Sequence, residues 1–520
     1  MKLLNYVGGD WIEGRGDGAP LIDPVTGETL ATASSEGIDF SAALAFARRT
    51  GGPALRALSY GERAALLGRV AETLGQRRDA YFEIARRNSG NTRTDAAIDI
   101  DGAIGTVKFY ARLGQGLGEA RHLVDGDLIR MAKDPAFQAL HVGTPRRGVA
   151  IHINAFNFPA WGLWEKAAVA LLAGVPVVAK PATATAWLAC EMVRDVIEAD
   201  ILPEGALSLI AGSAGDLLDH VGPQDMIAFT GSADTGALIR GHRAVLANGV
   251  RVNIEADSLN ATLLGPDAAP GSAEFDLLVK EAGRELTQKA GQKCTAIRRI
   301  LAPRAVAGAL TEALTARLEK TAYGDPANEA VRMGPLVSKA QQAAALDGFA
   351  ILSREADLVT GGDRGRPLDA DPETGCFVAP TLFRLADGRE GDAVHRHEVF
   401  GPAATVIGYD GEEAAFETIH RGGGSLVASI FSADPDFQAR AFLALGASHG
   451  RLYCVDAGDA EAATGHGIVM PMCLHGGPGR AGDGAELGGV RGLAFYHQMT
   501  ALQGPAATLQ SLAESGARLG

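Results

Sequence analysis

Apolar residues recur at every third or fourth position between residues 60 and 88, and arginine and glutamate occupy many of the positions between them. With this spacing, Leu66, Leu67, Val70 and Leu74 fall on one face of a helix. The pattern predicts an amphipathic helix over this segment, on the surface of an N-terminal lobe.

From residue 148 onward, short apolar runs alternate with segments of helical spacing. The runs are VAIHIN at 149–154, VPVVAK at 175–180, LSLIAG at 207–212, DMIAFTG at 225–231 and VRVNIEA at 250–256. Helices are predicted from about residue 159, in the segment that ends near residue 200, and near 233–246. Strands that are apolar throughout and alternate with helices predict an α/β fold, with a parallel sheet between helices.

A similar mixture of helices and apolar runs follows from residue 275 to 445 and predicts a second lobe after residue 255. In sheets of this kind, ligands bind beyond the carboxyl ends of the strands. Polar residues stand at those ends of the predicted strands, so the site is expected there.

The composition fits a large globular protein and limits its partners. The chain has 520 residues, 47% of them apolar and 21% charged, which is enough for about two to four lobes. A formal net charge of −14 repels nucleic acid and anionic lipid, and an anionic substrate would need a local basic pocket. The longest uncharged stretch, between Lys166 and Lys180, is too short for a membrane span.

The five cysteines are widely spaced and form no CxxC pair, which is typical of free thiols in a reducing compartment. The opening residues lack the apolar core of a signal peptide. We therefore expect a cytoplasmic protein with neither a membrane segment nor a nucleic-acid partner.

Three residues at predicted strand ends and loops could carry chemistry. Cys294 has Lys289 and Lys293 close in sequence, and cations or a helix N-terminus there would favour the thiolate. Asn157 closes a strand and could donate to an oxyanion, and Glu255 ends a buried strand and could be a general base with a raised pKa. Taken singly, a structural thiol, a turn asparagine and a solvent-facing or arginine-paired glutamate explain them as well.

Taken together, these residues resemble the aldehyde dehydrogenase family in order and spacing. The matching motifs are FNFP at 156–159, KPAT at 180–183, FTGS at 229–232, Glu255, GQKC at 291–294 and EVFGP at 398–402. The resemblance runs from about residue 5 to about residue 500, and it implies a Rossmann-like cofactor domain, an α/β catalytic domain and a small oligomerisation arm.

The resemblance implies that Cys294 is the nucleophile that attacks the aldehyde carbon. The Asn157 amide and the Cys294 backbone N–H would hold the oxyanion of the thiohemiacetal, and hydride would leave for the nicotinamide. Glu255 would then deprotonate the water that hydrolyses the thioester.

The resemblance also implies a set of cofactor-binding residues, which comprises Phe156, Lys180, Thr183, Gly231, Ser232, Gln341 and Glu398. Lys180 and Glu398 resemble ribose ligands, and Gly231 and Ser232 resemble the turn that faces the pyrophosphate. Members that prefer NAD commonly carry glutamate where this chain has Thr183, and a carboxylate there would repel a 2′-phosphate. We therefore expect NADP, with NAD possible and no metal.

Two departures from the sequence pattern of the family narrow the range of expected substrates. Glu255 leads into Ala256 and Asp257 rather than the usual Leu-Gly-Gly step, and His475 replaces the usual aromatic residue before a Gly-Gly loop. The next glycines, Gly477, Gly479 and Gly482, match GxGxxG, but no apolar strand precedes them and a substrate-side loop is expected.

The motifs are similar to those of the branch that oxidises CoA-thioester semialdehydes released on opening an aromatic ring. The implied substrate is 3,4-dehydroadipyl-CoA semialdehyde of aerobic benzoyl-CoA breakdown, with 3-oxo-5,6-dehydrosuberyl-CoA semialdehyde of phenylacetate breakdown as the alternative. Arg146 and Arg147 are candidates for a basic rim that contacts CoA, although solvated loop charges explain them as well.

The resemblance implies three segments. Residues 1–254 form the cofactor-binding domain, with an oligomerisation segment near 125–147, and residues 255–448 form the catalytic domain. Residues 449–520 return to the cofactor domain and end in an arm containing LAFYHQMTALQ, which predicts a homodimer or a dimer of dimers.

Three other functions compete with this one. An acylating enzyme of similar fold would use CoA to resolve the thioester and would not need Glu255. A noncatalytic protein that kept the fold would not need Cys294, Glu255 and Asn157 together. A metalloenzyme could use His395 with His397 or His466 with His475, but no recognised ligand spacing accompanies them.

Overall fold

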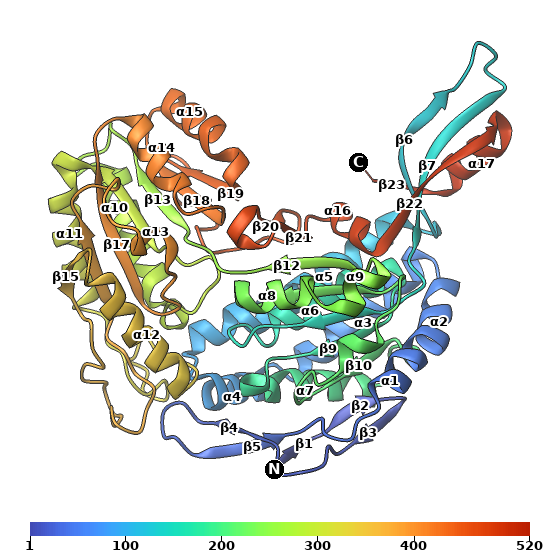
Figure 1. Ribbon diagram of the computed structural model, residues 1–520, viewed down its shortest axis with the longest axis horizontal. Coiled ribbons are helices and arrows are strands. Elements are labelled where there is room, and N and C mark those ends of the chain that lie inside the picture. Colours follow the sequence, from blue (N-terminus) through green and yellow to red (C-terminus); the bar gives the residue numbers. More distant parts are fainter. Residues whose placement is uncertain (520) are drawn as a thin grey trace.

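Two large sheets form the body of the protein, whose computed structural model describes residues 1–519. The chain passes from the first sheet to the second in the segment between Glu255 and Ala261, and the C-terminal part crosses back (Figure 1). Within residues 1–519, no helix combines the length and the apolar character that crossing a membrane requires.

The first sheet contains the five strands predicted from the apolar runs, and their predicted parallel pairing is confirmed. The strand order is β12-β11-β8-β9-β10-β2-β3. Its parallel members are β8 (Ala150–Ile153), β9 (Val177–Lys180), β10 (Leu207–Leu209), β11 (Met226–Thr230) and β12 (Arg251–Glu255). Two short N-terminal strands, β2 (Asn5–Val7) and β3 (Asp10–Ile12), extend the edge in antiparallel pairing.

Helices cover both faces of this sheet. They include α1 (Phe40–Phe46), α2 (Gly52–Ala57), α5 (Arg93–Leu117), α6 (Trp161–Ala173), α7 (Ala186–Glu198), α8 (Ala233–Arg240) and α9 (Arg243–Asn248). The helix predicted near 233–246 is two helices, because the chain turns at Gly241 and the His242 ring caps α9. A small N-terminal sheet of β1 (Lys2–Leu3), β5 (Thr29–Ala33) and β4 (Ala19–Ile22) lies beside the body.

The amphipathic helix predicted over 60–88 is also divided, into α3 (Tyr60–Gln76) and α4 (Arg78–Ser89). Arg77 leaves the helical conformation, with φ −101° and ψ 7°, and this turns α4 away from α3. Leu67, Val70 and Leu74 are buried as predicted. A capping box at Ser59 fixes the start of α3.

The second sheet has the order β15-β16-β17-β14-β13-β18-β19 and is parallel except for its edge strand β15. Its strands are β13 (Ala261–Leu264), β14 (Arg299–Pro303), β15 (Asp357–Thr360), β16 (Thr381–Leu385), β17 (Ala403–Tyr409), β18 (Ser425–Phe431) and β19 (His449–Val455). The helices around it include α10 (Ala273–Thr287), α11 (Arg304–Leu318), α12 (Lys339–Leu352), α13 (Ala393–Arg396), α14 (Glu412–His420) and α15 (Pro435–Leu445). β19 pairs with β18, so the second sheet continues to Val455, and the domain boundary at residue 448 stays a prediction.

The segment predicted for oligomerisation near 125–147 forms an arm that projects from the body (Figure 1). The arm consists of β6 (Leu123–Arg130), β7 (Phe137–Pro145), β22 (His497–Pro505), α17 (Ala506–Ser515) and β23 (Ala517–Arg518). β22 pairs with β7 along its whole length, so part of LAFYHQMTALQ is a strand, as predicted.

The Gly-rich segment after residue 473 forms a hairpin of β20 (Leu474–Gly477) and β21 (Gly484–Leu487), followed by the short helix α16 (Val490–Leu493). A Cβ atom at Gly482 or Gly484 would lie within 2.4 Å of the backbone carbonyl oxygen of Ile254. These glycines therefore allow the hairpin to pack directly on the end of β12, and this contact carries His475 into the centre of the molecule.

Candidate active site

The carboxyl ends of the parallel strands in the first sheet open into a cleft of about 510 Å³. All ten residues predicted for catalysis or cofactor binding line it, although they come from distant parts of the chain. They are Phe156, Asn157, Lys180, Thr183, Gly231, Ser232, Glu255, Cys294, Gln341 and Glu398.

Cys294 lines this cleft and also a second, more apolar pocket of about 350 Å³. The second pocket is lined by Phe109, Phe158, Trp161, Ile468, Val469 and Met470 among others. The thiol is therefore placed where a molecule in one pocket can meet a molecule in the other.

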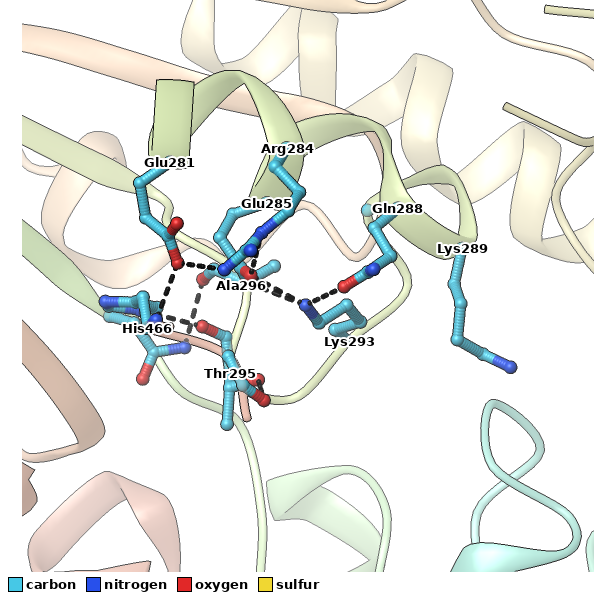
Figure 2. Close-up of polar contacts among 12 residues, drawn as sticks. Glu281, Arg284, Glu285, Gln288, Lys289, Lys293, Thr295, Ala296 and His466 are labelled. Atoms are coloured by element: carbon cyan, nitrogen blue, oxygen red, sulfur yellow. Dashed lines mark hydrogen bonds and ion pairs between the residues drawn. The ribbon is translucent and has the colours of Figure 1, made fainter. Parts of the chain in front are cut away.

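Hydrogen bonds to backbone carbonyls fix the loop that carries Cys294. Asn260 Nδ2 donates to the carbonyls of Cys294 at 2.7 Å and of Ala296 at 3.0 Å. His466 Nε2 lies 3.0 Å from the carbonyl oxygen of Thr295, as drawn in Figure 2. Asn157 Nδ2 donates to the carbonyl of Gln292 at 3.1 Å, so the predicted oxyanion donor is also tied to this loop.

The predicted helix N-terminus at Cys294 is wrong, and the nearby lysines favour the thiolate less than predicted because both are engaged elsewhere. Lys293 Nζ is held 2.8 Å from both carboxylate oxygens of Glu285 and 2.6 Å from Gln288 Oε1 (Figure 2). Lys289 Nζ lies over the Phe158 ring, 4.5 Å from its centroid. Cys294 precedes β14 rather than a helix.

As a result, burial and the nearby Glu255 carboxylate raise the pKa of the Cys294 thiol, and Lys293 offsets this only in part. The electrostatic environment of the free enzyme therefore favours the protonated thiol over the thiolate.

Glu255 ends β12 and is buried, as predicted. His475 Nε2 lies 3.0 Å from Glu255 Oε2, off the axis of an ideal hydrogen bond. Burial alone would raise the pKa of Glu255, but the contact with His475 and the charge of Lys166 outweigh it and lower the pKa to about 2. The predicted raised pKa is therefore wrong, and the carboxyl is ionised at neutral pH.

A buried cluster of charges lies behind Glu255 and was not predicted from the sequence. Lys166 Nζ is 2.7 Å from Glu165 Oε1 and 3.0 Å from Glu486 Oε2. Burial raises the pKa of Glu165 to about 8, although Lys166 lowers it in part. The signal was present in the sequence, because a Glu-Lys pair interrupts an otherwise apolar helix.

The residues predicted to contact the cofactor surround the wider part of the cleft. Ser232 caps α8, and Phe156 packs edge-on against Phe400 with ring centroids 5.7 Å apart. Glu398 accepts a hydrogen bond from Ser258 N at 3.0 Å and pairs with Arg298, with Nε and Oε1 3.3 Å apart. Burial raises the pKa of Glu398 to about 7.

Arg146 and Arg147 do not line either pocket. Arg146 is buried and donates to the carbonyls of Pro223 and Gln224 and to Gln498 Oε1, so it has a structural role. The cation on the lining of the apolar pocket is instead Arg112, from α5, whose side chain is exposed.

The histidines considered as metal ligands have other partners. His466 Nδ1 lies 2.9 Å from Ser429 Oγ, and His395 Nδ1 lies 3.3 Å from Arg299 Nη1. Glu255, Cys294 and His475 lie close enough together to share an ion, but Cys294 and Glu255 are the predicted nucleophile and base. The absence of a metal from the reaction stays a prediction.

The fold and this arrangement of thiol, amide and carboxylate define an oxidoreductase class. The chain belongs to the aldehyde dehydrogenase family, whose model matches residues 11–501. It is accordingly an NAD(P)-dependent aldehyde dehydrogenase.

Two curated relatives show which aldehyde dehydrogenases this chain is similar to. The 3,4-dehydroadipyl-CoA semialdehyde dehydrogenase of Aromatoleum evansii is 57% identical over 479 residues, which are 92% of this chain and 93% of that protein. The alpha-ketoglutarate semialdehyde dehydrogenase of Haloferax volcanii is 30% identical over 78% of this chain and 80% of that protein.

Solved structures confirm the predicted fold. Betaine aldehyde dehydrogenase from Staphylococcus aureus, in complex with NAD+, aligns with a TM-score of 0.84 and 24% identity, over 97% of this chain and 95% of that one. A 3,6-anhydro-L-galactose dehydrogenase in complex with NAP aligns with a TM-score of 0.84 and 23% identity, over 97% and 100% of the two chains.

Proposed function

We propose that this enzyme oxidises the aldehyde group of a CoA-thioester semialdehyde to the carboxylic acid, with NADP as the cofactor. The substrate favoured is 3,4-dehydroadipyl-CoA semialdehyde, an intermediate of aerobic benzoyl-CoA breakdown, because the Aromatoleum relative carries that name at 57% identity. The observation that carries the chemistry is the position of Cys294 at the junction of a polar cleft and an apolar pocket.

The polar cleft fits a dinucleotide. The Asn154 side-chain amide and the Thr230 hydroxyl line it, and both are buried without a protein partner. Lys180 Nζ donates to the carbonyl of Pro181 at 3.1 Å and keeps further donors for a ligand. When bound, NADP would supply the acceptor for the hydride, and Lys180, Thr183, Ser232 and Glu398 would hold it.

Cys294, Asn157 and Glu255 have different roles in the proposed reaction. The Cys294 thiolate attacks the aldehyde carbon, and the Asn157 amide with the Cys294 backbone N–H donates to the oxyanion. Glu255, ionised in the free enzyme, accepts a proton from the water that hydrolyses the resulting thioester. Because Glu255 is present, water rather than CoA is the acyl acceptor.

Arg112 is the proposed contact for the anionic part of CoA, because it is an exposed cation on the lining of the apolar pocket. The acyl chain would lie against Phe109, Trp161 and Ile468, and the aldehyde end would reach Cys294.

The substrate class is tested by steady-state kinetics with NADP, comparing a CoA-linked semialdehyde with the matching free semialdehyde. We expect kcat/KM to be roughly tenfold or more higher for the CoA-linked form, because remote binding energy contributes to transition-state stabilisation. Equal or better rates with the free aldehyde would be consistent with the dehydrogenase chemistry but would contradict the proposal of a CoA-linked substrate.

The cofactor preference is tested by Thr183→Glu. The new carboxylate would repel the 2′-phosphate of NADP, so KM for NADP should rise by roughly tenfold or more while KM for NAD changes little. Thr183→Gln has the same size without the charge and should keep the preference for NADP. If Thr183→Glu leaves both KM values unchanged, Thr183 does not face the 2′ position.

We also infer that the arm formed by β6, β7 and β22 makes the contact of a homodimer. The support is that it projects from the body and exposes apolar side chains, with Phe137 48% exposed and Ile129 44% exposed (Figure 1). Sedimentation of the full chain should give at least a dimer, and shortening the β6–β7 tip should shift it toward the monomer.

A further inference from the structure

His475 takes no part in the reaction as described, yet its ring touches both central groups. Its Nε2 lies 3.0 Å from Glu255 Oε2 and 3.9 Å from Cys294 Sγ. The ring is 3% exposed, and its centroid lies 5.7 Å from that of Trp161. The hairpin that carries it packs on β12, so this position is built into the fold.

The surroundings of Cys294 carry an excess of negative charge. Glu255 faces the thiol from β12, and the buried carboxyls of Glu165 and Glu486 lie behind it on α6 and β21. Lys166, between those two carboxyls, is the cation of this cluster. Because burial raises the pKa of Glu165 to about 8, the negative charge near Cys294 comes from Glu255 and Glu486. A thiolate forming there would be disfavoured unless a cation besides Lys166 were close.

The lysines near Cys294 in sequence provide that cation only in part, because Lys293 lowers the pKa of the thiol but does not outweigh burial and Glu255. Lys293 is bound to Glu285 and Gln288, and Lys289 lies over Phe158. His475 does face the sulfur, and the nearby carboxylates raise its pKa even though burial alone would lower it. The nearby carboxylates thus shift the imidazole toward its imidazolium form at the place where the thiolate must form.

We propose that His475 is a catalytic residue whose imidazolium stabilises the Glu255 carboxylate and the Cys294 thiolate in turn. This inference rests on Cys294 as nucleophile, and it goes beyond the proposed function by assigning a further residue.

The step is a proton transfer between two groups that share one cation. The S–H bond of Cys294 breaks and an O–H bond forms on Glu255, so the negative charge moves from the carboxylate to the sulfur. Both positions lie within reach of the same Nε2–H group, so His475 keeps its proton and does not have to move. The total charge of the three groups is unchanged. Glu255, which lines the cleft, then releases this proton to solvent before it accepts one from the hydrolytic water.

The test is the pH dependence of Cys294 alkylation by iodoacetamide in the full-length enzyme, without substrate. Peptide mass spectrometry follows Cys294 separately, because Cys473 is exposed and will also react. His475→Phe keeps a flat ring and removes the cation, so the thiol pKa should rise by about one unit or more. The alkylation rate of Cys294 at pH 7 should fall by about tenfold or more, since only the thiolate reacts.

His475→Gln provides a second, smaller variant that retains a neutral hydrogen-bond donor. Its profile should also move to higher pH, by less than that of His475→Phe. The thermal midpoint and NADP binding of both variants establish that the fold is retained. A profile of either folded variant that coincides with that of the wild type would overturn the proposal.

This assay uses no aldehyde, so it is independent of the substrate assigned above. Failure of the CoA-linked substrate would leave the alkylation result unaffected. Conversely, unshifted alkylation profiles together with a preference for the CoA-linked semialdehyde would reject His475 and keep the proposed function.

Discussion

The Cys294→Ala variant is expected to lose aldehyde oxidation by on the order of 10⁴-fold or more, because alanine cannot form the covalent thiohemiacetal. The fold and NADP binding should persist, because contacts to backbone carbonyls hold the Cys294 loop. Asn260 donates hydrogen bonds to two of these carbonyls, and His466 contacts the carbonyl oxygen of Thr295. Initial rates of NADPH formation, together with a fluorescence titration of NADPH, measure both properties.

Cys473→Ala serves as the matched control, because that thiol is exposed. It should retain wild-type turnover. Appreciable turnover by Cys294→Ala would show that Cys294 is not the nucleophile, whatever the substrate.

The Glu255→Gln variant is expected to form one equivalent of NADPH per site in a slowed burst, because Glu255 is also the proposed acceptor of the Cys294 proton, and then to stall. Glutamine preserves the size of the side chain but cannot accept a proton from water, so the thioester should accumulate. The steady-state rate should fall by roughly 10²- to 10⁴-fold, while the burst amplitude stays near one per site. Stopped-flow absorbance at 340 nm resolves the two phases.

Hydroxylamine gives an internal check of this assignment, because a stronger nucleophile can cleave the thioester without a general base. Added to the stalled variant after unreacted substrate has been removed, it should release the acyl group from Cys294 and allow a second burst with fresh semialdehyde and NADP. Normal steady-state turnover of the variant in water alone would contradict the role of Glu255 as base.

Much of the fold could be predicted from local sequence patterns. The parallel strands β8, β9 and β11 of the first sheet are largely apolar runs buried on both faces, and helices lie near them along the chain. Breaks within helices were not predicted, because the turns at Arg77 and Gly241 interrupt segments whose apolar spacing continues on both sides.

The members of the site could also be predicted, because motifs at strand ends converge on one edge of a sheet. Their electrostatics could not be predicted. The contact between Cys294 and His475 joins residues 181 positions apart, and Lys293 turns toward Glu285 on α10 rather than toward the thiol beside it. Proximity along the chain therefore did not reveal the Glu255 carboxylate that raises the pKa of Cys294, although the neighbouring Lys293 lowers that pKa in part.

Intact-mass measurement of Glu255→Gln, mixed with NADP and a CoA-linked semialdehyde, tests the central claim most directly. We expect a covalent adduct on Cys294 whose mass includes both the acyl chain and its attached CoA, since the aldehyde end alone has reacted. Hydroxylamine should remove it. An absent adduct, an adduct on another residue, or an adduct formed only from free aldehydes would contradict the proposed chemistry.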